Sequence, residues 1–361
     1  MVNKKGGIAI KAKKLINYID LGKVKHLAII GLAKNAGKTV TLNKVVKEAF
    51  EKNIKMALIS YGRDGEKVDS ITLQEKPRIY IPPHTVFVTA ENAFRKSSIE
   101  AKTLVETDID SLLGKVNIYK SKDDGGNVEL VGINSSSRVK KIKEKIPNDV
   151  DLILIDGALD RRSSAMPSLT EAFIMATGAV LANTEDLVIK KTMHEIRRLT
   201  IPQVSSKLLK KKVENIFNKG KDGIILKNGN LKFLESKTSF GHLKELQNMD
   251  CSKIASLIIN GALIDSFVEK LIYDLKLKNL NIIVQDGTRV FLNKRNMNLL
   301  EKANNELKVF NNLNLLAVTV NPTSPYSASL DANKIIKGLN AKLVKVPVYD
   351  ILSEKYKSIE R

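Results

Sequence analysis

The chain is predicted to fold as an α/β protein with a mostly parallel sheet and helices on both faces. Short apolar runs of strand length alternate along its 361 residues with amphipathic stretches of helical length, which is typical of a parallel sheet covered on both sides. A glycine-rich turn at residues 31–39 joins one such run to one such stretch. With 43% hydrophobic and 27% charged residues, the composition is that of a folded globular protein.

The alternation places the individual elements. Apolar runs bounded by turn residues predict strands at residues 25–31, 56–60, 86–89, 116–119, 128–133, 152–155, 179–181, 256–259, 281–284 and 315–320. Apolar residues at helical spacing predict helices at residues 38–53, 136–145, 186–199, 265–275 and 330–338. In the first helix, the apolar face is expected to hold Val40, Val45, Val46, Ala49 and Phe50.

The turn "GLAKNAGKT" at residues 31–39 is typical of a phosphate-binding loop. A glycine-rich turn before a helix leaves backbone N–H groups unpaired at the positive end of the helix dipole. Lys38 supplies a charge for the β- and γ-phosphates, and the Thr39 hydroxyl is a ligand for Mg²⁺. The match to G-x-x-x-x-G-K-[ST] is incomplete, because Leu32 occupies the first glycine position. Contacts to the nucleotide are predicted for Gly31, Lys34, Asn35, Ala36, Gly37, Lys38, Thr39 and Val40.

This loop makes the predicted fold that of a P-loop NTPase. We expect an N-terminal helical segment at residues 1–25, a nucleotide-binding α/β region at 26–235 and a C-terminal α/β half at 250–361 that continues the same sheet. Two alternating runs around Asp123-Asp124-Gly125-Gly126 predict a β-hairpin insertion near 115–133, and a second hairpin is expected around Asn228-Gly229-Asn230.

A second nucleotide signal is the apolar strand that ends in Asp156. A carboxylate at the tip of a strand beside the loop holds Mg²⁺ through water; a plain Asp-Gly turn is the alternative. Arg161 follows, either to stabilise the charge of transferring phosphate or to pair with a carboxylate. At the tip of the strand at residues 56–60, Asp64 is the first candidate for a further Mg²⁺ or catalytic carboxylate, and Asp69 is the second.

Composition excludes several classes of protein. No window reaches the roughly 18 apolar residues that span a membrane, so no membrane partner is expected. The single cysteine, Cys251, excludes a disulfide framework and fits the cytoplasm. The four histidines show no metal-ligand spacing. The net charge of +21 is spread over nearly every segment, which favours a basic solvated surface over nucleic-acid binding.

Five blocks in order along the chain resemble a known family: "GLAKNAGKTVTLN", "SYGRDGE", "KPRIYIPPHTVFVTAE", "DLILIDGALDRRSSAMPSLTEAFIMATGA" and "VTVNPTSP". They are similar to the reactivase subunits linked to adenosylcobalamin-dependent lysine 5,6-aminomutase. The resemblance implies a P-loop protein that acts with a MutS-like ATPase subunit to restore an inactivated aminomutase. More broadly, these blocks resemble the class of P-loop proteins that includes dethiobiotin synthetase and the Min and Par ATPases.

The sequence also allows other interpretations of function. In a dethiobiotin-synthetase-like ligase or kinase, Arg63 and Arg78 would bind a carboxylate substrate; a nucleotide-dependent assembly or nucleic-acid factor is a further alternative. ATP and GTP are not distinguished, and Asn321 at a strand tip is either a contact to the base or part of an Asn-Pro turn. Lys34 suggests phosphate contact or, in a homodimer, a role across the dimer. The segment 161–173 is either a nucleotide-responsive switch or a loop that caps a helix at Ser168 or Thr170.

Overall fold

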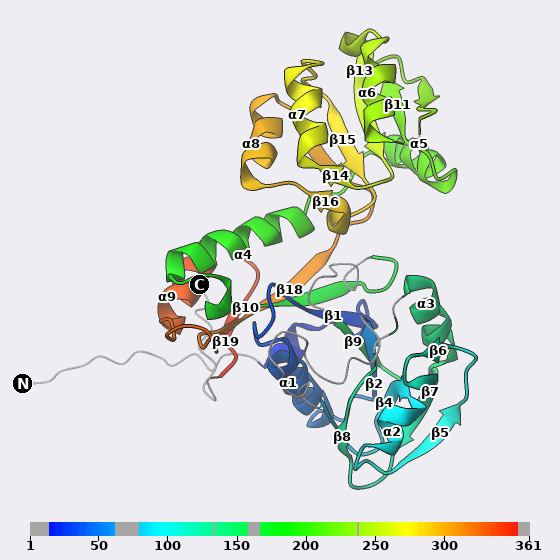
Figure 1. Ribbon diagram of the computed structural model, residues 1–361, viewed down its shortest axis with the longest axis vertical. Helices are drawn as coiled ribbons and strands as arrows, with labels where there is room; N and C mark the ends of the chain where they lie inside the picture. The colour runs from blue at the N-terminus through cyan, green and yellow to red at the C-terminus, as the bar shows by residue number, and fades with distance from the viewer. Residues whose placement is uncertain are drawn as a thin grey trace, which may run out of the picture. The chain divides into compact units, whose positions relative to one another are not determined.

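The computed structural model describes residues 14–61, 79–131, 133, 135–157, 167–236 and 238–352, without the side chains of Ser239 and Phe240. The chain divides into two compact units (Figure 1). Unit 1 contains Met1–Met193 and Leu315–Arg361, and unit 2 is the intervening His194–Asn314. Unit 2 is therefore an insertion between two parts of unit 1.

The elements of unit 1 follow the expected alternation. Its strands are β1 (His26–Gly31), β2 (Met56–Tyr61), β3 (Ile79–Ile81), β4 (Val86–Ala90), β5 (Ala101–Val105), β6 (Asp110–Ser111), β7 (Gly114–Ser121), β8 (Gly126–Val128), β9 (Leu152–Gly157), β10 (Ala172–Gly178), β18 (Asn314–Asn321) and β19 (Val348–Asp350). Its helices are η1 (Leu15–Tyr18), α1 (Lys38–Phe50), α2 (Glu91–Arg95), α3 (Ser136–Lys145), η3 (Ala179–Leu181) and α9 (Ala332–Asn340), and α4 (Glu185–Leu199) runs from unit 1 into unit 2.

A ten-stranded, mostly parallel sheet forms the centre of unit 1. Its order is β19-β18-β10-β1-β9-β2-β4-β7-β5, with β6 paired to β7. The pairs of β1 with β10 and β9, and of β2 with β9 and β4, are parallel. Strand β7 is antiparallel to both β4 and β5. The structure thus confirms a mixed α/β fold with a large, mostly parallel sheet.

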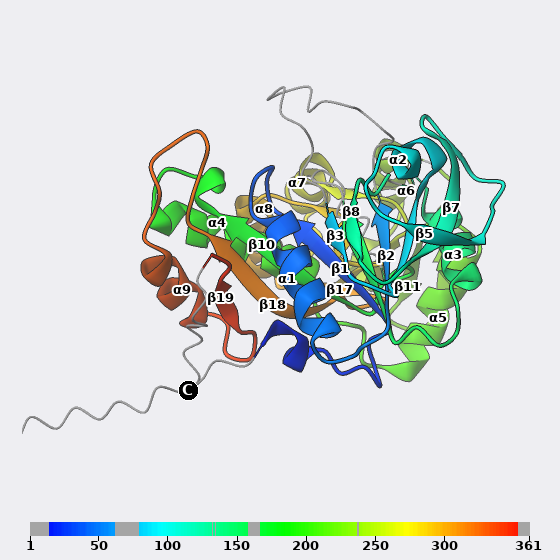
Figure 2. The same cartoon turned by 90° about the horizontal axis from the view of Figure 1, so that it is seen from below.

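Both faces of this sheet are buried, because successive side chains of a strand point to opposite sides. On one face, Leu27, Ile29 and Leu154 pack with helix α1, which runs along β1 and β10 in Figure 2. On the other face, Ile153 and Ile155 pack with side chains of α3. The apolar strands predicted from the sequence therefore lie between two helical layers.

Helix α1 buries a face slightly different from the expected one. Val40 is 43% exposed and Phe50 is 44% exposed, so the prediction that both lie on the apolar face is wrong. Thr41 and Leu42 are buried in their place, together with Val45, Val46 and Ala49. The polar Thr41 is accepted in the core because its hydroxyl is hydrogen-bonded.

Three local expectations in unit 1 are corrected. The first hairpin does not form, because β7 has β4 and β5 on its two edges and β8 pairs instead with β3. Residues 179–181 are a 3₁₀ turn, and the preceding β10 is the strand. No helix begins at Ser168 or Thr170, since β10 starts at Ala172. Of the N-terminal segment, the described residues from 14 to 25 contain the short 3₁₀ helix η1.

Unit 2 has its own five-stranded sheet, in the order β12-β11-β13-β15-β17. The strands β13, β15 and β17 are parallel, and β11 and β12 form the second predicted hairpin, which is confirmed. The strands are β11 (Gly223–Leu226), β12 (Leu231–Phe233), β13 (Ile254–Ile259), β14 (Leu263–Ile264), β15 (Asn281–Val284), β16 (Val290–Phe291) and β17 (Glu306–Val309). The helices are α5 (Lys207–Asn218), α6 (Ser239–Gln247), η4 (Cys251–Lys253), α7 (Asp265–Tyr273), η5 (Gly287–Arg289) and α8 (Lys294–Lys302).

The domain boundaries differ from those expected at residues 235–250. Only β18 and β19 of the C-terminal half join the large sheet, while β13, β15 and β17 belong to the separate sheet of unit 2. The apolar pattern of a buried strand is the same in either sheet. Its partner strands are therefore decided by tertiary packing, and the expectation of one continuous sheet is wrong for residues 250–314.

Candidate functional site

The turn after β1 is a compact loop of residues 32–37 at the carboxyl end of a central strand. Leu32 N donates to Ala176 O of β10 at 3.0 Å, which fixes the start of the loop to the neighbouring strand. Asn35 and Gly37 have φ angles of 62° and 94°, in the left-handed region that glycine adopts at least cost. The glycine at position 37 is thus required by the backbone, as the motif predicts.

Helix α1 begins directly after this loop, with Gly37 as its N-cap and no side-chain cap. Within the described part of the chain, the amides of Gly37, Lys38 and Thr39 donate no backbone hydrogen bond. Unpaired N–H groups at the positive end of a helix bind anions. Helix α1 has 13 residues, and its dipole places a partial positive charge at its N-terminus. The loop therefore has the chemistry of an anion-binding site.

Lys38 and Asp156 form an ion pair beside these amides. Asp156 lies in β9, in register with Ile29 of β1 and Ser60 of β2. Its Oδ1 is 2.9 Å from Lys38 Nζ, and the two side chains are 16% and 15% exposed. Lys38 Nζ also donates to the Gly157 carbonyl oxygen. Lys38 and Asp156 therefore lie together at the loop, where the sequence pattern predicts them.

The other predicted loop residues differ in how they are placed. Ala36 is 1% exposed, and its amide donates to Ala33 O at 3.3 Å, so this residue is engaged within the loop. Lys34 is half-buried within the loop, and Asn35 is exposed. A Cβ on Gly31 would lie 3.4 Å from Lys38 Cβ, which is ordinary contact. Thr39 is half-buried in the first turn of α1, next in the chain to Lys38.

Asn321, at the end of β18, is bonded to the loop itself. Its Nδ2 donates to Asn35 O at 3.1 Å. Its Oδ1 accepts from Thr323 N at 3.2 Å and from Thr323 Oγ1 at 2.8 Å. The side-chain amide therefore has both ends engaged in the protein, one of them on the loop.

A buried hydrogen-bond chain joins the same strand to the first turn of α1. Thr319 Oγ1 and Thr41 Oγ1 are 2.7 Å apart, and Thr41 Oγ1 donates to Gly37 O at 2.9 Å. Both threonine side chains are fully buried. Sequence reasoning missed these two residues, because neither the loop motif nor the apolar pattern distinguishes a threonine that bonds across a core.

Several predicted site residues lie outside the described residues. They are the second carboxylate candidates Asp64 and Asp69 and the arginines Arg63, Arg78 and Arg161. The strands that lead to two of these segments are in place, since β2 and β9 are neighbours and end beside each other at Tyr61 and Gly157. The predictions for these residues stay predictions.

The described residues contain no group of three or more His, Cys, Asp or Glu side chains arranged to hold a metal ion. The metal ligands predicted with a bound nucleotide are Thr39 and Asp156, to which phosphate oxygens and water would add. A nucleotide-dependent Mg²⁺ site needs few protein ligands. The donors present are therefore of the type that such a site requires.

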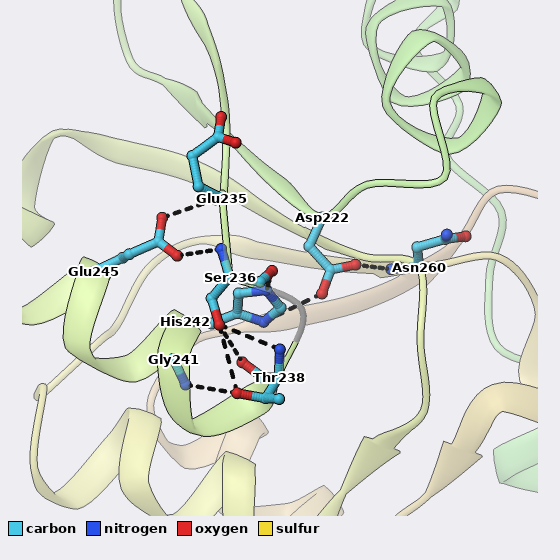
Figure 3. Close-up of polar contacts among 8 residues, drawn as sticks. All are labelled: Asp222, Glu235, Ser236, Thr238, Gly241, His242, Glu245 and Asn260. Carbon is cyan, nitrogen blue, oxygen red and sulfur yellow. Dashed lines mark hydrogen bonds and ion pairs between the residues drawn. The ribbon is translucent and has the colours of Figure 1, made fainter.

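Unit 2 holds a second buried polar cluster, shown in Figure 3. His242 Nε2 donates to Ser236 O at 2.7 Å, and its Nδ1 is 3.2 Å from Asp222 Oδ2. Asp222 Oδ1 accepts from Asn260 N at 2.6 Å. Burial raises the pKa of Asp222, against the opposing effects of the Asn260 N–H group and His242. Because the two side chains are 13% and 5% exposed, the pair is structural and ties α6 to the ends of β11 and β13.

Comparisons of the chain with protein-family models, with curated proteins and with solved structures find no significant match. Across the described ranges, no helix is both long and apolar enough to cross a bilayer. The functional interpretation consequently depends on the loop, its neighbouring side chains and the sequence motifs.

Proposed function

We propose that the protein binds a nucleoside triphosphate with Mg²⁺ at residues 31–39 and Asp156, and hydrolyses it. The observation that carries the proposal is the Lys38–Asp156 pair at the start of α1, where the amides of Gly37, Lys38 and Thr39 donate no backbone hydrogen bond to any described residue. The amides and Lys38 would bind phosphate oxygens, and the Thr39 hydroxyl and Asp156 carboxylate would hold the metal. When bound, Mg²⁺ neutralises charge on the transferring phosphate.

The Lys38–Asp156 ion pair can be exchanged for contacts to a nucleotide. Among the described residues, Asp156 Oδ1 accepts no hydrogen bond and has Lys38 Nζ at 2.9 Å as its ionic partner. An arriving triphosphate offers Lys38 a more highly charged partner, which would release the carboxylate to accept hydrogen bonds from metal-bound water. Lys38 and Asp156 are thus kept paired with each other until the ligand replaces this contact.

The finer proposal is that nucleotide turnover serves to reactivate a cobalamin-dependent lysine aminomutase together with a MutS-like ATPase subunit. Its support is the series of sequence blocks from residue 31 to residue 325. Unit 2 is also a compact unit with its own core, and we propose it as the part of the chain that contacts the partner. ATP is proposed over GTP because the chain lacks an N-K-x-D motif.

Calorimetric titration tests the nucleotide site. We expect the parent protein to bind ATP with Mg²⁺ and Lys38→Ala to bind it about 30- to 160-fold more weakly, because a charged contact to phosphate is worth about 2–3 kcal/mol. Lys47→Ala, an exposed lysine on the same helix, is the matched control and should bind as the parent does. Equal affinity of the parent and Lys38→Ala for both ATP and GTP would reject the site.

A reconstitution tests the finer proposal. An aminomutase inactivated by turnover should regain activity only with this protein, the MutS-like subunit, Mg²⁺, ATP and fresh adenosylcobalamin together. Rescue by the Lys38→Ala variant at the parent's rate, or no rescue by the complete mixture, would leave a nucleotide-binding protein with another client. Because the chain carries a net charge of +21, the rescue rate should fall as salt rises.

A further inference from the structure

The strand β18 contacts the candidate phosphate loop at two places and the first turn of α1 at a third. The Asn321 amide donates to the carbonyl of Asn35 at 3.1 Å. A Cβ on Gly37 would lie 3.1 Å from Asn321 Cβ, so the two residues are packed closely. One turn further into α1, the Thr319 hydroxyl is bonded to that of Thr41 inside the core.

The contact with Asn35 falls at a left-handed position of the loop backbone. Asn35 has a φ of 62°, a conformation that few non-glycine residues other than Asn and Asp adopt. A hydrogen bond to its carbonyl fixes the orientation of the peptide unit that follows. The Thr41–Gly37 bond fixes the peptide unit between Gly37 and Lys38 in the same way, at the other end of the loop.

The side chain that makes this contact is itself held in place. Both hydrogen bonds of Thr323 converge on Asn321 Oδ1, which orients the amide with its Nδ2 toward the loop. A Cβ placed on Gly178, at the end of β10, would lie 2.0 Å from Asn321 O. The backbone of Asn321 therefore packs directly against β10 at a position, residue 178, where only glycine fits.

We infer that Asn321 is a positioning residue that holds the loop of residues 32–37 in its phosphate-binding shape, and is not a contact to the base. The inference rests on the proposed function of the loop. The amide donates one of its two Nδ2 hydrogens to Asn35 O and accepts both bonds from Thr323 at Oδ1, so its orientation is set by contacts within the protein. Asn321 would therefore affect a ligand only through the loop amides, which bind phosphate groups and not the base.

Inorganic tripolyphosphate, which has the phosphates of ATP and no base, separates the two roles. Affinities for ATP, GTP and tripolyphosphate with Mg²⁺ are measured for the parent, Asn321→Ala and Thr319→Val. For Asn321→Ala we expect all three affinities to fall by the same factor, about tenfold, with the ratio of ATP to GTP unchanged. Thr319→Val, which removes the bond to Thr41, should also weaken all three equally.

Asn333→Ala is the matched control, because Asn333 is an exposed asparagine of the same unit, on α9. Thermal melting checks that each variant is folded under the binding conditions. A loss of affinity for ATP or GTP with tripolyphosphate binding unchanged would assign Asn321 to the base and overturn the inference. Unchanged affinity for all three would overturn it as well. A parent protein that binds none of the three would instead reject the proposed function.

Discussion

The Lys38–Asp156 pair gives a prediction whose size follows from its geometry. At 2.9 Å and an effective dielectric constant of about 20, two opposite charges attract by about 6 kcal/mol. Removing both side chains from water offsets most of this attraction. Since about one sixth of each side chain remains exposed, we expect a net coupling of about 1–3 kcal/mol in favour of the folded protein.

A double-mutant cycle measures this coupling. Lys38→Met removes the ammonium and keeps the length of the side chain, and Asp156→Asn removes the opposing charge at nearly constant shape. Unfolding free energies from urea denaturation of the parent, both single variants and the double variant give the interaction energy. Lys38→Met should lower stability by about 2 kcal/mol, because it leaves a mostly buried carboxylate without its cation.

The second substitution should then repair the first. In the Lys38→Met background, Asp156→Asn is expected to raise stability, since the unpaired charge disappears. Additive effects of the two substitutions, with a coupling below about 0.5 kcal/mol, would show that the pair does not form in the free protein. The same result would remove the argument that Lys38 exchanges Asp156 for a phosphate when nucleotide binds.

Three further predictions concern catalysis, loop strain and pH. Asp156→Asn should keep much of the parent's nucleotide affinity and lose at least tenfold in Mg²⁺-dependent hydrolysis, measured as phosphate release; hydrolysis at the parent's rate would make Asp156 a structural residue. Gly37→Ala should lower the unfolding free energy by about 1–2 kcal/mol, because φ is 94° there and Asn321 leaves little room for a Cβ; a melting temperature equal to the parent's would contradict the loop geometry. Burial raises the pKa of Asp286, although bonds from Thr288 and the charge of Arg289 lower it. The folded protein therefore keeps this proton to a higher pH than the unfolded chain, and its stabilising contribution, full at low pH, is lost as pH rises through the folded pKa. Relative to Asp286→Asn, the parent should lose stability between about pH 4 and the folded pKa, and parallel urea profiles of the two proteins would exclude the raised pKa.

In both units, local chemistry determines where many of the elements form. The helix at 136–145 and the strand at 281–284 match α3 and β15 residue for residue, because apolar periodicity and turn residues are properties of neighbouring positions. The left-handed backbone at position 37 is equally local, since the motif places glycine where the turn needs it. Ser136–Lys145 and the loop could both be located without any knowledge of their partners.

The sequence by itself determined the class of fold, the glycine-rich turn and the two charged residues, Lys38 and Asp156, that lie beside it. Only the tertiary structure decided which strands pair, so that β8 joins β3 instead of β7 and strands between residues 223 and 309 form a second sheet. It also decided that Asn321 and Thr319, far along the chain, hold the loop through Asn35 and Thr41. The physical reason is that the pairing of strands and of buried hydroxyls depends on which surfaces meet in three dimensions, and no spacing within a segment records that.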